Sequence, residues 1–404
     1  MSVKLCSAAQ CTACGLCIAN CGKKAISFQL NEYGCEMPVI DQALCISCQK
    51  CKRICPAENT TQGNPIKTVY AAWSLDEDIR LNAASGGMAS TICHYALDRG
   101  WKAFGVDFTP DQGAVFIEVS SDNLSRIRNS KYSYASDTLP YDRIAEAVSG
   151  GKTIFIGLPC QVAAVKKHIA TRQCPADNLF SIDLLCHGIA PRQYILQHLS
   201  AVKAKKGDTV FFRDPQKGTR NYYFSVIRNG RTVYSRKVEE DDVYQLGYHK
   251  ALIYRENCYN CQYTNTNRMG DLTLGDFSGL GKTKPIAYSG NNVNCVTVNT
   301  DRGMELLNAL TAEGLISIDE RPIEEAIQYE HQFIAPSVPH KKRTVFLEKL
   351  RETGSFEISA KFALKQERNR YHRAKYSGKL LLQELSLRVI TPEMRRNVKG
   401  MIKG

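Results

Sequence analysis

Residues 11–21 read Cys-Thr-Ala-Cys-Gly-Leu-Cys-Ile-Ala-Asn-Cys, and residues 45–55 read Cys-Ile-Ser-Cys-Gln-Lys-Cys-Lys-Arg-Ile-Cys. In both runs the cysteines are spaced C-x2-C-x2-C-x3-C, and each cysteine of the second run stands 34 residues after its counterpart in the first. The two runs are therefore an internal repeat. Because the turns between the first three cysteines of a run are short, their thiolates can reach a common point, which indicates metal-sulfur chemistry.

This spacing is typical of 4Fe-4S clusters, in which the fourth cysteine of one run usually binds the cluster of the other run. We therefore predict one cluster on Cys11, Cys14, Cys17 and Cys55, and a second on Cys45, Cys48, Cys51 and Cys21. Such a segment resembles the bacterial two-cluster ferredoxins, and we expect it to form a domain over residues 1–60. Structural zinc, the alternative, fits two triplets with a fourth member each poorly. The first run departs from the ferredoxin pattern in that a glycine, Gly22, follows it where the second run has Pro56.

The composition describes an ordinary globular protein that is long enough for two or three domains. The chain has 404 residues, of which 43% are apolar and 23% charged. Its 17 cysteines do not indicate a secreted disulfide scaffold, since no signal peptide is recognisable and the cysteines are grouped at metal-binding spacings. No apolar run reaches the 18 or so residues that a membrane span requires. We expect a cytoplasmic protein, with peripheral membrane contact as a further option.

Residues 61–335 alternate short apolar runs with helical stretches, which predicts a domain of mixed α and β structure and places the chain in the α+β class. We expect strands at residues 69–73, 154–157 and 182–185, and a helix over residues 88–97. The last two strands deliver Cys160 and Cys186 at their carboxyl ends, where open α/β sheets place their chemistry. Ser85, Gly86 and Gly87 precede the helix, whose free N-H groups can hold a phosphate, although such residues are also ordinary caps.

A third pair of cysteines stands at Cys258 and Cys261 and needs two more ligands to complete a site. Since Cys160 and Cys186 are available, we predict a third 4Fe-4S cluster on these four residues. The alternative is a zinc clip with two core cysteines. We interpret the five remaining cysteines as packing or loop residues: Cys6, Cys35, Cys93, Cys174 and Cys295.

Seven short motifs occur in the order seen in one known family. They are Ala84-Ser-Gly-Gly87, Ser130-Lys-Tyr132, Gly157-Leu-Pro-Cys-Gln161, Asp183-Leu-Leu-Cys-His-Gly188, Phe212-Arg-Asp214, Cys258-Tyr-Asn-Cys261 and Gly270-Asp-Leu-Thr-Leu-Gly-Asp276. On these motifs the chain resembles the coenzyme F-420 hydrogenase and dehydrogenase beta-subunit family over about residues 68–300. The resemblance implies a bound FAD beside a 4Fe-4S cluster, with cluster ligands at the same four cysteines that their pattern in the sequence had indicated.

By the same resemblance, the flavin contacts fall on Ser85, Gly86, Gly87, Lys131, Tyr132 and Gln161. A flavin accepts two electrons as hydride and releases them singly, whereas each cluster carries one. For the proton relay we consider His187, next to a predicted ligand, and Lys131, near the predicted flavin. Either can instead have a structural role, and for His187 this would be a hydrogen bond that orients the cluster ligand.

The C-terminal segment carries most of the net charge of +13. Residues 341–404 contain 17 Lys and Arg against 6 Asp and Glu, which leaves a balance of +2 for residues 1–340. We predict a basic, helical tail over residues 336–404, with apolar positions that include Leu380, Leu381, Leu382, Leu385 and Leu387. It can lie on an anionic membrane, dock an acidic protein, or pack on its own body. No nucleic-acid partner is expected, because the tail lacks a module with interleaved aromatic residues.

These observations predict an iron-sulfur flavoprotein oxidoreductase. Electrons would pass between ferredoxin-type clusters and an organic hydride donor or acceptor through FAD. The partner at the other end would be a redox protein. The alternative is an electron-transfer subunit of a larger redox complex that contacts no substrate itself. The sequence names neither the substrate nor the direction of electron flow.

Overall fold

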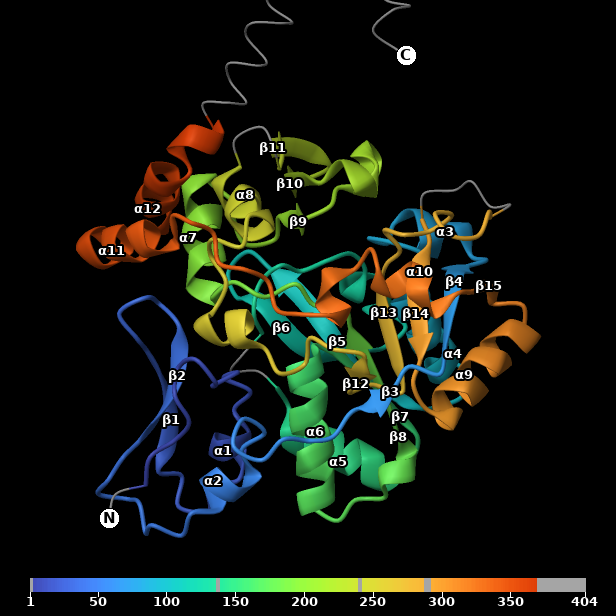
Figure 1. Cartoon of the computed structure of the whole chain (residues 1–404), viewed down its shortest axis with the longest axis horizontal. Coiled ribbons are helices and arrows are strands. Elements are labelled where there is room, and N and C mark those ends of the chain that lie inside the picture. Colours follow the sequence, from blue (N-terminus) through green and yellow to red (C-terminus); the bar gives the residue numbers. More distant parts are fainter. Residues whose placement is uncertain (1–2, 136–138, 239–241, 287–291, 369–404) are drawn as a thin grey trace, which may run out of the picture.

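The centre of the molecule is a mixed β-sheet whose middle strands are buried on both faces (Figure 1). The computed structural model describes residues 3–135, 139–238, 242–286 and 292–368. Every residue of the strand Thr153–Gly157 is buried, which explains why residues 154–157 are all apolar instead of alternating with polar ones. Its two neighbouring strands run parallel to it, and antiparallel strands complete the sheet on both sides. The predicted class, mixed α and β, is confirmed.

The strands of this sheet follow each other in space in an order that differs from their order in the chain. The spatial order is β15 (Ile316–Arg321), β4 (Thr68–Ser74), β14 (Asn294–Val298), β13 (Leu272–Asp276), β8 (Leu179–Leu184), β7 (Thr153–Gly157), β5 (Lys102–Thr109) and β6 (Gly113–Glu118). The strands expected at residues 69–73, 154–157 and 182–185 correspond to β4, β7 and β8. Because β7 and β8 are adjacent and parallel, the cysteines that follow them leave the sheet at the same edge.

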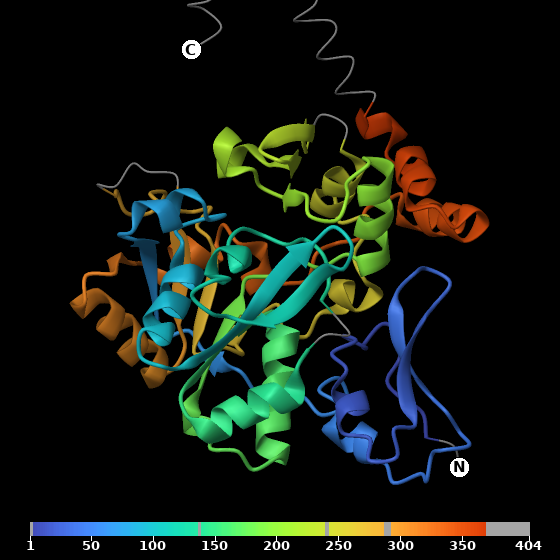
Figure 2. The same ribbon diagram turned by 180° about the vertical axis from the view of Figure 1, so that it is seen from behind.

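Helices cover the sheet on both faces and make it the middle of three layers (Figure 2). α4 (Met88–Leu97) and α9 (Asp301–Ala312) share one apolar core with the sheet. α5 (Tyr141–Gly150) and α6 (Pro159–Thr171) share another with it. Two short helices, α3 (Glu77–Leu81) and α10 (Ile323–Ile327), lie beside β4. The helix predicted over residues 88–97 has these bounds in the structure.

The N-terminal segment forms a compact unit beside α6 in both views. It contains α1 (Leu16–Ala19), a hairpin of β1 (Ile26–Leu30) and β2 (Glu36–Ile40), and α2 (Lys50–Ile54). The cysteine repeat is also a repeat of backbone conformation. Ala13 and Gly15 in the first run, and Ser47 and Gln49 in the second, have positive φ at positions 34 residues apart. These left-handed residues form the tight turns that bring the cysteines of each run together.

A second, mostly helical lobe packs against the end of the sheet. Its elements are α7 (Arg192–Ala201), β9 (Thr209–Phe211), β10 (Tyr223–Arg228), β11 (Arg231–Lys237), α8 (Val243–His249), α11 (Arg343–Thr353) and α12 (Phe356–Ala363). One further short sheet pairs β3 (Asn64–Pro65) with β12 (Asn267–Arg268) and joins the N-terminal unit to the body. Among the described residues, no helix has the length and apolar character needed to cross a lipid bilayer.

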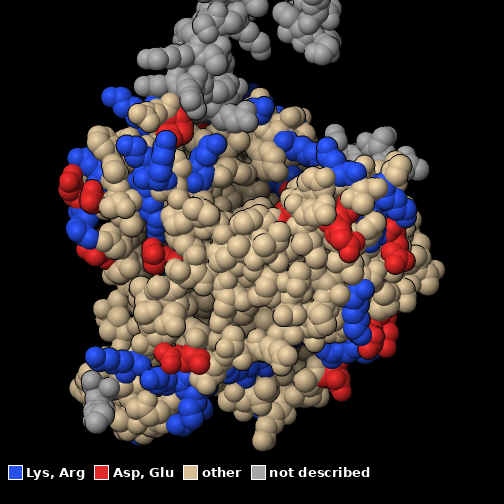
Figure 3. All heavy atoms as spheres, in the orientation of Figure 1, with Lys and Arg blue, Asp and Glu red and all other residues tan. Residues whose placement is uncertain are grey.

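The described part of the predicted basic tail, residues 336–368, packs on the body. Phe346, Leu350 and Phe356 are buried in the core of the helical lobe, and Phe356 stacks on Tyr194 of α7 with ring centroids 5.1 Å apart. Lys and Arg side chains gather on the surface of this lobe in Figure 3. Of the three options for the tail, packing on the body therefore describes α11 and α12. Leu380, Leu381, Leu382, Leu385 and Leu387 lie outside the described residues.

A buried histidine joins three helices of this lobe. His198 on α7 contacts Asp242, the N-cap of α8, at 2.9 Å through Nε2, and Glu357 of α12 at 2.5 Å through Nδ1. Burial opposes the charged imidazolium, but the carboxylates of Asp242 and Glu357 outweigh it and raise the pKa of His198 to about 9. The three side chains thus form an ion triad that holds the C-terminal helices in place.

This triad predicts a stability that falls with rising pH. The unfolded histidine has a pKa of about 6.5, so the triad stabilises the fold fully below that pH and loses its contribution as the pH rises through 9. The free energy of unfolding of the wild-type chain should exceed that of His198→Asn near pH 6, and the difference should shrink by up to about 1.4 kcal/mol per pH unit. Denaturation by urea at several pH values measures it. A difference that grows with pH would contradict the charge assignment.

Candidate functional site

Four cysteines from distant parts of the chain line one cavity. Cys160 stands in the first turn of α6 after β7, Cys186 follows β8, Cys258 lies in the short helix Glu256–Asn260, and Cys261 follows that helix. We call these four residues the third cysteine site. The structure brings together the ligands that were expected for a third cluster, although they span about a hundred residues of sequence.

Cys258 is buried and the other three cysteines of the third cysteine site are half-buried, and their thiols are close enough to influence one another. Burial raises the pKa of Cys160 well above its usual value, and the thiols of Cys261, Cys186 and Cys258 raise it further. Burial likewise raises the pKa of Cys186 to about 12. Buried thiolates need a bound cation, and a metal-bound thiol is deprotonated outright. Among the described residues, no three His, Cys, Asp or Glu side chains are grouped closely enough to hold a single metal ion. A set of four separate thiols fits an iron-sulfur cluster.

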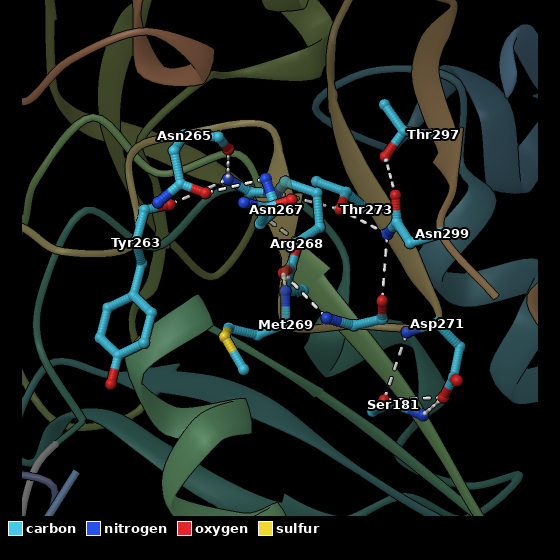
Figure 4. Close-up of polar contacts among 12 residues, drawn as sticks. Ser181, Tyr263, Asn265, Asn267, Arg268, Met269, Asp271, Thr273, Thr297 and Asn299 are labelled. Atoms are coloured by element: carbon cyan, nitrogen blue, oxygen red, sulfur yellow. Dashed lines mark hydrogen bonds and ion pairs between the residues drawn. The ribbon is translucent and has the colours of Figure 1, made fainter. Parts of the chain in front are cut away.

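A buried polar network fixes the chain after Cys261 against the strand that leads to Cys186 (Figure 4). The Asp183 carboxylate in β8 pairs with the Arg268 guanidinium at 3.1 Å and accepts hydrogen bonds from the backbone N-H groups of Met269 and Gly270 at 2.8 and 3.0 Å. A Cβ on Gly270 would lie 2.5 Å from the Asp183 backbone nitrogen, so only glycine fits there. The motif Gly270–Asp276 thus fixes the position of the chain after Cys261 relative to β8, the strand that leads to Cys186.

A second, larger cavity of about 370 Å³ lies beside the third cysteine site. Five of the six residues expected to contact flavin line it: Ser85, Gly87, Lys131, Tyr132 and Gln161. The sixth, Gly86, packs behind this wall, where a Cβ would lie 2.5 Å from the Ala72 carbonyl oxygen. Both residues considered for the proton relay, Lys131 and His187, also line the large cavity.

Two of the expected flavin contacts have polar atoms that already bind backbone groups. The Ser85 hydroxyl donates to the Val293 carbonyl at 2.6 Å. The Gln161 side chain accepts from the Leu158 N-H at 2.9 Å and donates to the Ala135 carbonyl at 3.3 Å. These side chains therefore shape the cavity wall. Gly87, with φ of 84°, is the N-cap of α4 and lines the cavity. The N-terminus of α4, which is the positive end of the helix dipole, therefore lies at the cavity.

Cationic groups dominate the charged lining of the large cavity. Nε of Arg128 is buried and has no hydrogen-bond partner among the described residues, whereas Nη1 of the same guanidinium pairs with Asp78 at 2.7 Å. The Lys131 ammonium donates to the carbonyls of Arg128 and Asn129 at 2.5 and 3.2 Å, and no carboxylate of the described chain pairs with it. Arg213 contacts the single lining carboxylate, Asp276, at 2.7 Å. A wall with spare donors and a helix N-terminus fits an anionic group such as the diphosphate of a dinucleotide.

Lys131 should affect the stability of the flavin-free protein in a pH-dependent way. Burial lowers the pKa of Lys131 to about 7, whereas the unfolded lysine has a pKa of about 10.4. Between these values the unfolded chain binds more protons, so the stability of the wild-type chain should rise with pH. Lys131→Met removes this effect. We expect Lys131→Met to be most stabilising, relative to wild type, near or below pH 7 and to lose that advantage by roughly pH 10. Parallel urea denaturation of both proteins measures it, and an advantage that is independent of pH would contradict the prediction.

Several cavity residues escaped the sequence analysis. Tyr132 stacks on Tyr248 of α8, with ring centroids 4.4 Å apart, and His249 lies against the edge of the same ring. Neither Tyr248 nor His249 belongs to a recognisable motif. Arg213 stands within the motif Phe212–Asp214, so its position in the sequence was a usable signal. His187 stays a candidate, because it lines the large cavity.

The two cavities share a wall. Leu158, Cys186, His187, Gly188 and Ile189 line both of them. Gly188 has φ of 135°, and a Cβ there would lie 2.3 Å from the Tyr254 ring, so only glycine fits at this point of the wall. Because Cys186 lines both cavities, a group bound in the large cavity would lie against a residue of the third cysteine site.

Thiols of the two cysteine runs lie near one another in the N-terminal unit, and Cys6 lies beside them, with its Sγ 3.8 Å from that of Cys55. Burial raises the pKa of Cys14 to about 11, and the nearby thiols of Cys11 and Cys55 raise it further. Burial also raises the pKa of Cys51, with Cys48 and Cys21 as its thiol neighbours. We call Cys11, Cys14, Cys17 and Cys55 the inner ferredoxin site, and Cys45, Cys48, Cys51 and Cys21 the outer ferredoxin site. Cys17 has Cys51 as a thiol neighbour besides Cys11, Cys14 and Cys55, and the crossed ligand assignment stays a prediction.

The inner ferredoxin site faces the third cysteine site. The thiol of Cys14 lies close enough to Cys160 to influence its pKa. Tyr134 donates to the Thr12 carbonyl, and Tyr141 donates to the Cys14 carbonyl at 2.7 Å, so two buried tyrosines of the body hold the first cysteine run. In the outer ferredoxin site, Cys48 is exposed. Three groups of cysteines thus extend from the large cavity to the surface.

Two parts of the chain match a known protein family. Residues 69–140 match the N-terminal part, and residues 150–324 the C-terminal part, of the family described as the beta subunit of coenzyme F420 hydrogenase/dehydrogenase. A chain in the structure "Xenon derivatization of the F420-reducing [NiFe] hydrogenase complex from Methanosarcina barkeri" is similar at 18% identity and a TM-score of 0.46, over 79% of this chain and 94% of that one. No curated protein matches.

The two matches are to the N-terminal and C-terminal parts of the same beta subunit. Together they span the central sheet, the large cavity and all four residues of the third cysteine site. Residues 1–68, which hold the ferredoxin-like repeat, lie outside both matches. The chain belongs to the coenzyme F420 hydrogenase/dehydrogenase beta-subunit family.

Proposed function

We propose that this protein is an iron-sulfur flavoprotein oxidoreductase that passes electrons between an organic hydride donor or acceptor and a redox partner protein. FAD would occupy the large cavity, and 4Fe-4S clusters would occupy the third cysteine site and both ferredoxin sites. The observation that carries the proposal is the wall shared by the two cavities, which includes Cys186 itself. A predicted cluster ligand thereby lies at the surface of the predicted flavin site.

The residues of the large cavity supply binding and proton transfer. The N-terminus of α4 and the unpartnered Nε of Arg128 offer donors to a diphosphate. Lys131, whose pKa burial lowers to about 7, can give or take a proton at its ammonium near neutral pH. Bound flavin would supply the exchange between hydride and single electrons. Aromatic side chains, with Tyr132 stacked on Tyr248, line the cavity on the side of α8.

The outer ferredoxin site is the proposed point of exchange with the partner protein. Cys48 is exposed there, and the neighbouring side chains Leu44 and Ile46 expose 51% and 63% of their surface. Electron transfer needs close approach but only a small interface, for which such a surface is sufficient. A cytoplasmic location is part of the proposal, and the contact of residues 369–404 with a membrane or an acidic protein stays a prediction.

The test uses the isolated chain, purified without oxygen. Its iron, acid-labile sulfide and flavin contents are measured first, and a chain without flavin would overturn the proposal. The chain is then mixed with a reduced deazaflavin or a reduced nicotinamide and an artificial one-electron acceptor. We expect turnover with at least one organic hydride donor. Bound flavin and clusters without turnover with either donor would favour the alternative, in which the chain passes electrons to a separate catalytic partner.

A further inference from the structure

A buried arginine without a carboxylate partner lies between two of the cysteine sites. Arg255 is 2% exposed and lines the cavity of the third cysteine site. Its Nη2 donates to the Glu36 carbonyl oxygen at 3.1 Å, and its guanidinium lies over the Tyr134 ring, 5.0 Å from the ring centroid. Two donors, Nε and Nη1, have no hydrogen-bond partner in the part of the chain that the structure describes.

An unpaired buried cation is costly, so it calls for a compensating negative charge. The other buried arginine of this cavity, Arg268, has one, because it pairs with Asp183 at 3.1 Å. Among the described residues, no Asp or Glu carboxylate pairs with Arg255. Its neighbours are cysteines instead. Cys258 of the third cysteine site lines the same cavity as Arg255, and so does Thr12, which is next to Cys11 of the inner ferredoxin site. The charge of Arg255 also acts on Cys35, which lies outside every predicted ligand set.

We propose that Arg255 is a positioning residue for the electron path, and that its guanidinium sets the reduction potentials of the two clusters on either side of it. The proposal rests on the iron-sulfur clusters of the proposed function. Each cluster gains one negative charge on reduction, and a neighbouring fixed positive charge stabilises the reduced form, as do N-H donors aimed at cluster sulfurs. Arg255 supplies both, since its charge is uncompensated and two of its donors are free.

The location makes this effect selective. Arg255 is held by a backbone contact to β2 of the N-terminal unit and begins the short loop that carries Cys258, so it bridges the two parts of the protein. The cavity that Arg255 lines includes no cysteine of the outer ferredoxin site. The reduction potentials therefore differ along the path. Arg255 raises those of the clusters in the third cysteine site and the inner ferredoxin site, and it leaves that of the outer cluster unchanged.

The test is a redox titration of the complete, cluster-loaded chain followed by electron paramagnetic resonance. Arg255→Met removes the charge at similar length, Arg255→Lys keeps the charge without the planar fork, and Arg255→Gln keeps neutral N-H donors. We expect the one-electron reduction equilibrium of the inner ferredoxin cluster and of the third cluster to become at least about tenfold less favourable in Arg255→Met, which is about 59 mV for one electron. Arg255→Lys should retain most of the wild-type potentials.

The outer cluster serves as an internal control, because its potential should not change in any of these variants. Arg343→Met is the matched arginine control. Arg343 pairs with Glu256 at 3.0 Å, so this substitution does not remove an unpaired buried cation. If Arg255→Met binds less iron, Arg255→Gln makes the same comparison. Wild-type potentials at both inner clusters in Arg255→Gln would overturn the inference while leaving the proposed function intact. A wild-type chain that binds no clusters would overturn both.

Discussion

Replacing Cys258 with serine is expected to remove about a third of the iron and sulfide from the purified chain, corresponding to one of three clusters. The reason is geometric: Cys258 is one of four thiols around one cavity, and the serine hydroxyl is a poor ligand for iron. The two ferredoxin sites do not include Cys258, so their clusters should remain. Iron and sulfide analysis of anaerobically prepared protein, with resonance spectra of the reduced state, measures the loss.

Cys174→Ser is the matched control for this variant. Cys174 is half-buried in the loop after α6 and lies outside every predicted ligand set, so its replacement should leave the iron content unchanged. Equal iron in Cys258→Ser and wild type would refute the third cluster. Loss of all iron from Cys258→Ser, with none lost from Cys174→Ser, would mean that the three cysteine sites do not fill independently.

Filling the large cavity should abolish flavin binding while the iron content stays near that of the wild type. Ala84 lines the cavity at the start of the segment that leads into α4. Ala84→Trp places an indole in a space of about 370 Å³ that the flavin would occupy. We expect a loss of bound flavin of more than about tenfold, which corresponds to about 1.4 kcal/mol or more of binding free energy. Flavin released by acid and quantified by fluorescence measures it.

Ala176→Trp is the control for the added indole, because Ala176 is exposed in the loop before β8 and does not line the cavity. It should retain full flavin content. If Ala84→Trp binds as much flavin as Ala176→Trp, the flavin lies elsewhere, and the shared wall with Cys186 loses its significance.

The elements that could be predicted from the sequence are those with a strong local signal. The all-apolar run of β7 predicts a strand covered on both faces, and the cap and apolar pattern of Met88–Leu97 predict the helix with its observed bounds. The short spacings of the cysteine repeat predicted that thiols of one run lie near each other, as Cys11 and Cys14 do, and Cys48 and Cys51. In each case the information is contained in a few adjacent residues.

Features that depend on long-range packing were not predictable. Nothing near Tyr134 or Tyr248 in the sequence indicates that the first holds the inner ferredoxin site or that the second stacks on Tyr132. The missing partners of Arg255 become visible only once the surrounding carboxylates are placed. Conversely, Ser85 and Gln161 were expected to contact flavin, but their polar atoms bind backbone groups, a competition that a motif does not reveal.

The central claim is that the three cysteine sites and the large cavity form one path for electrons. The most direct measurement is stopped-flow reduction of the whole, cluster-loaded chain by a low-potential electron donor protein, with flavin absorbance as the readout. The account predicts that the wild-type flavin is reduced through the ferredoxin clusters, and that in Cys258→Ser the ferredoxin clusters are reduced while the flavin stays oxidised on the same timescale. Flavin reduction at the wild-type rate in Cys258→Ser would contradict the account.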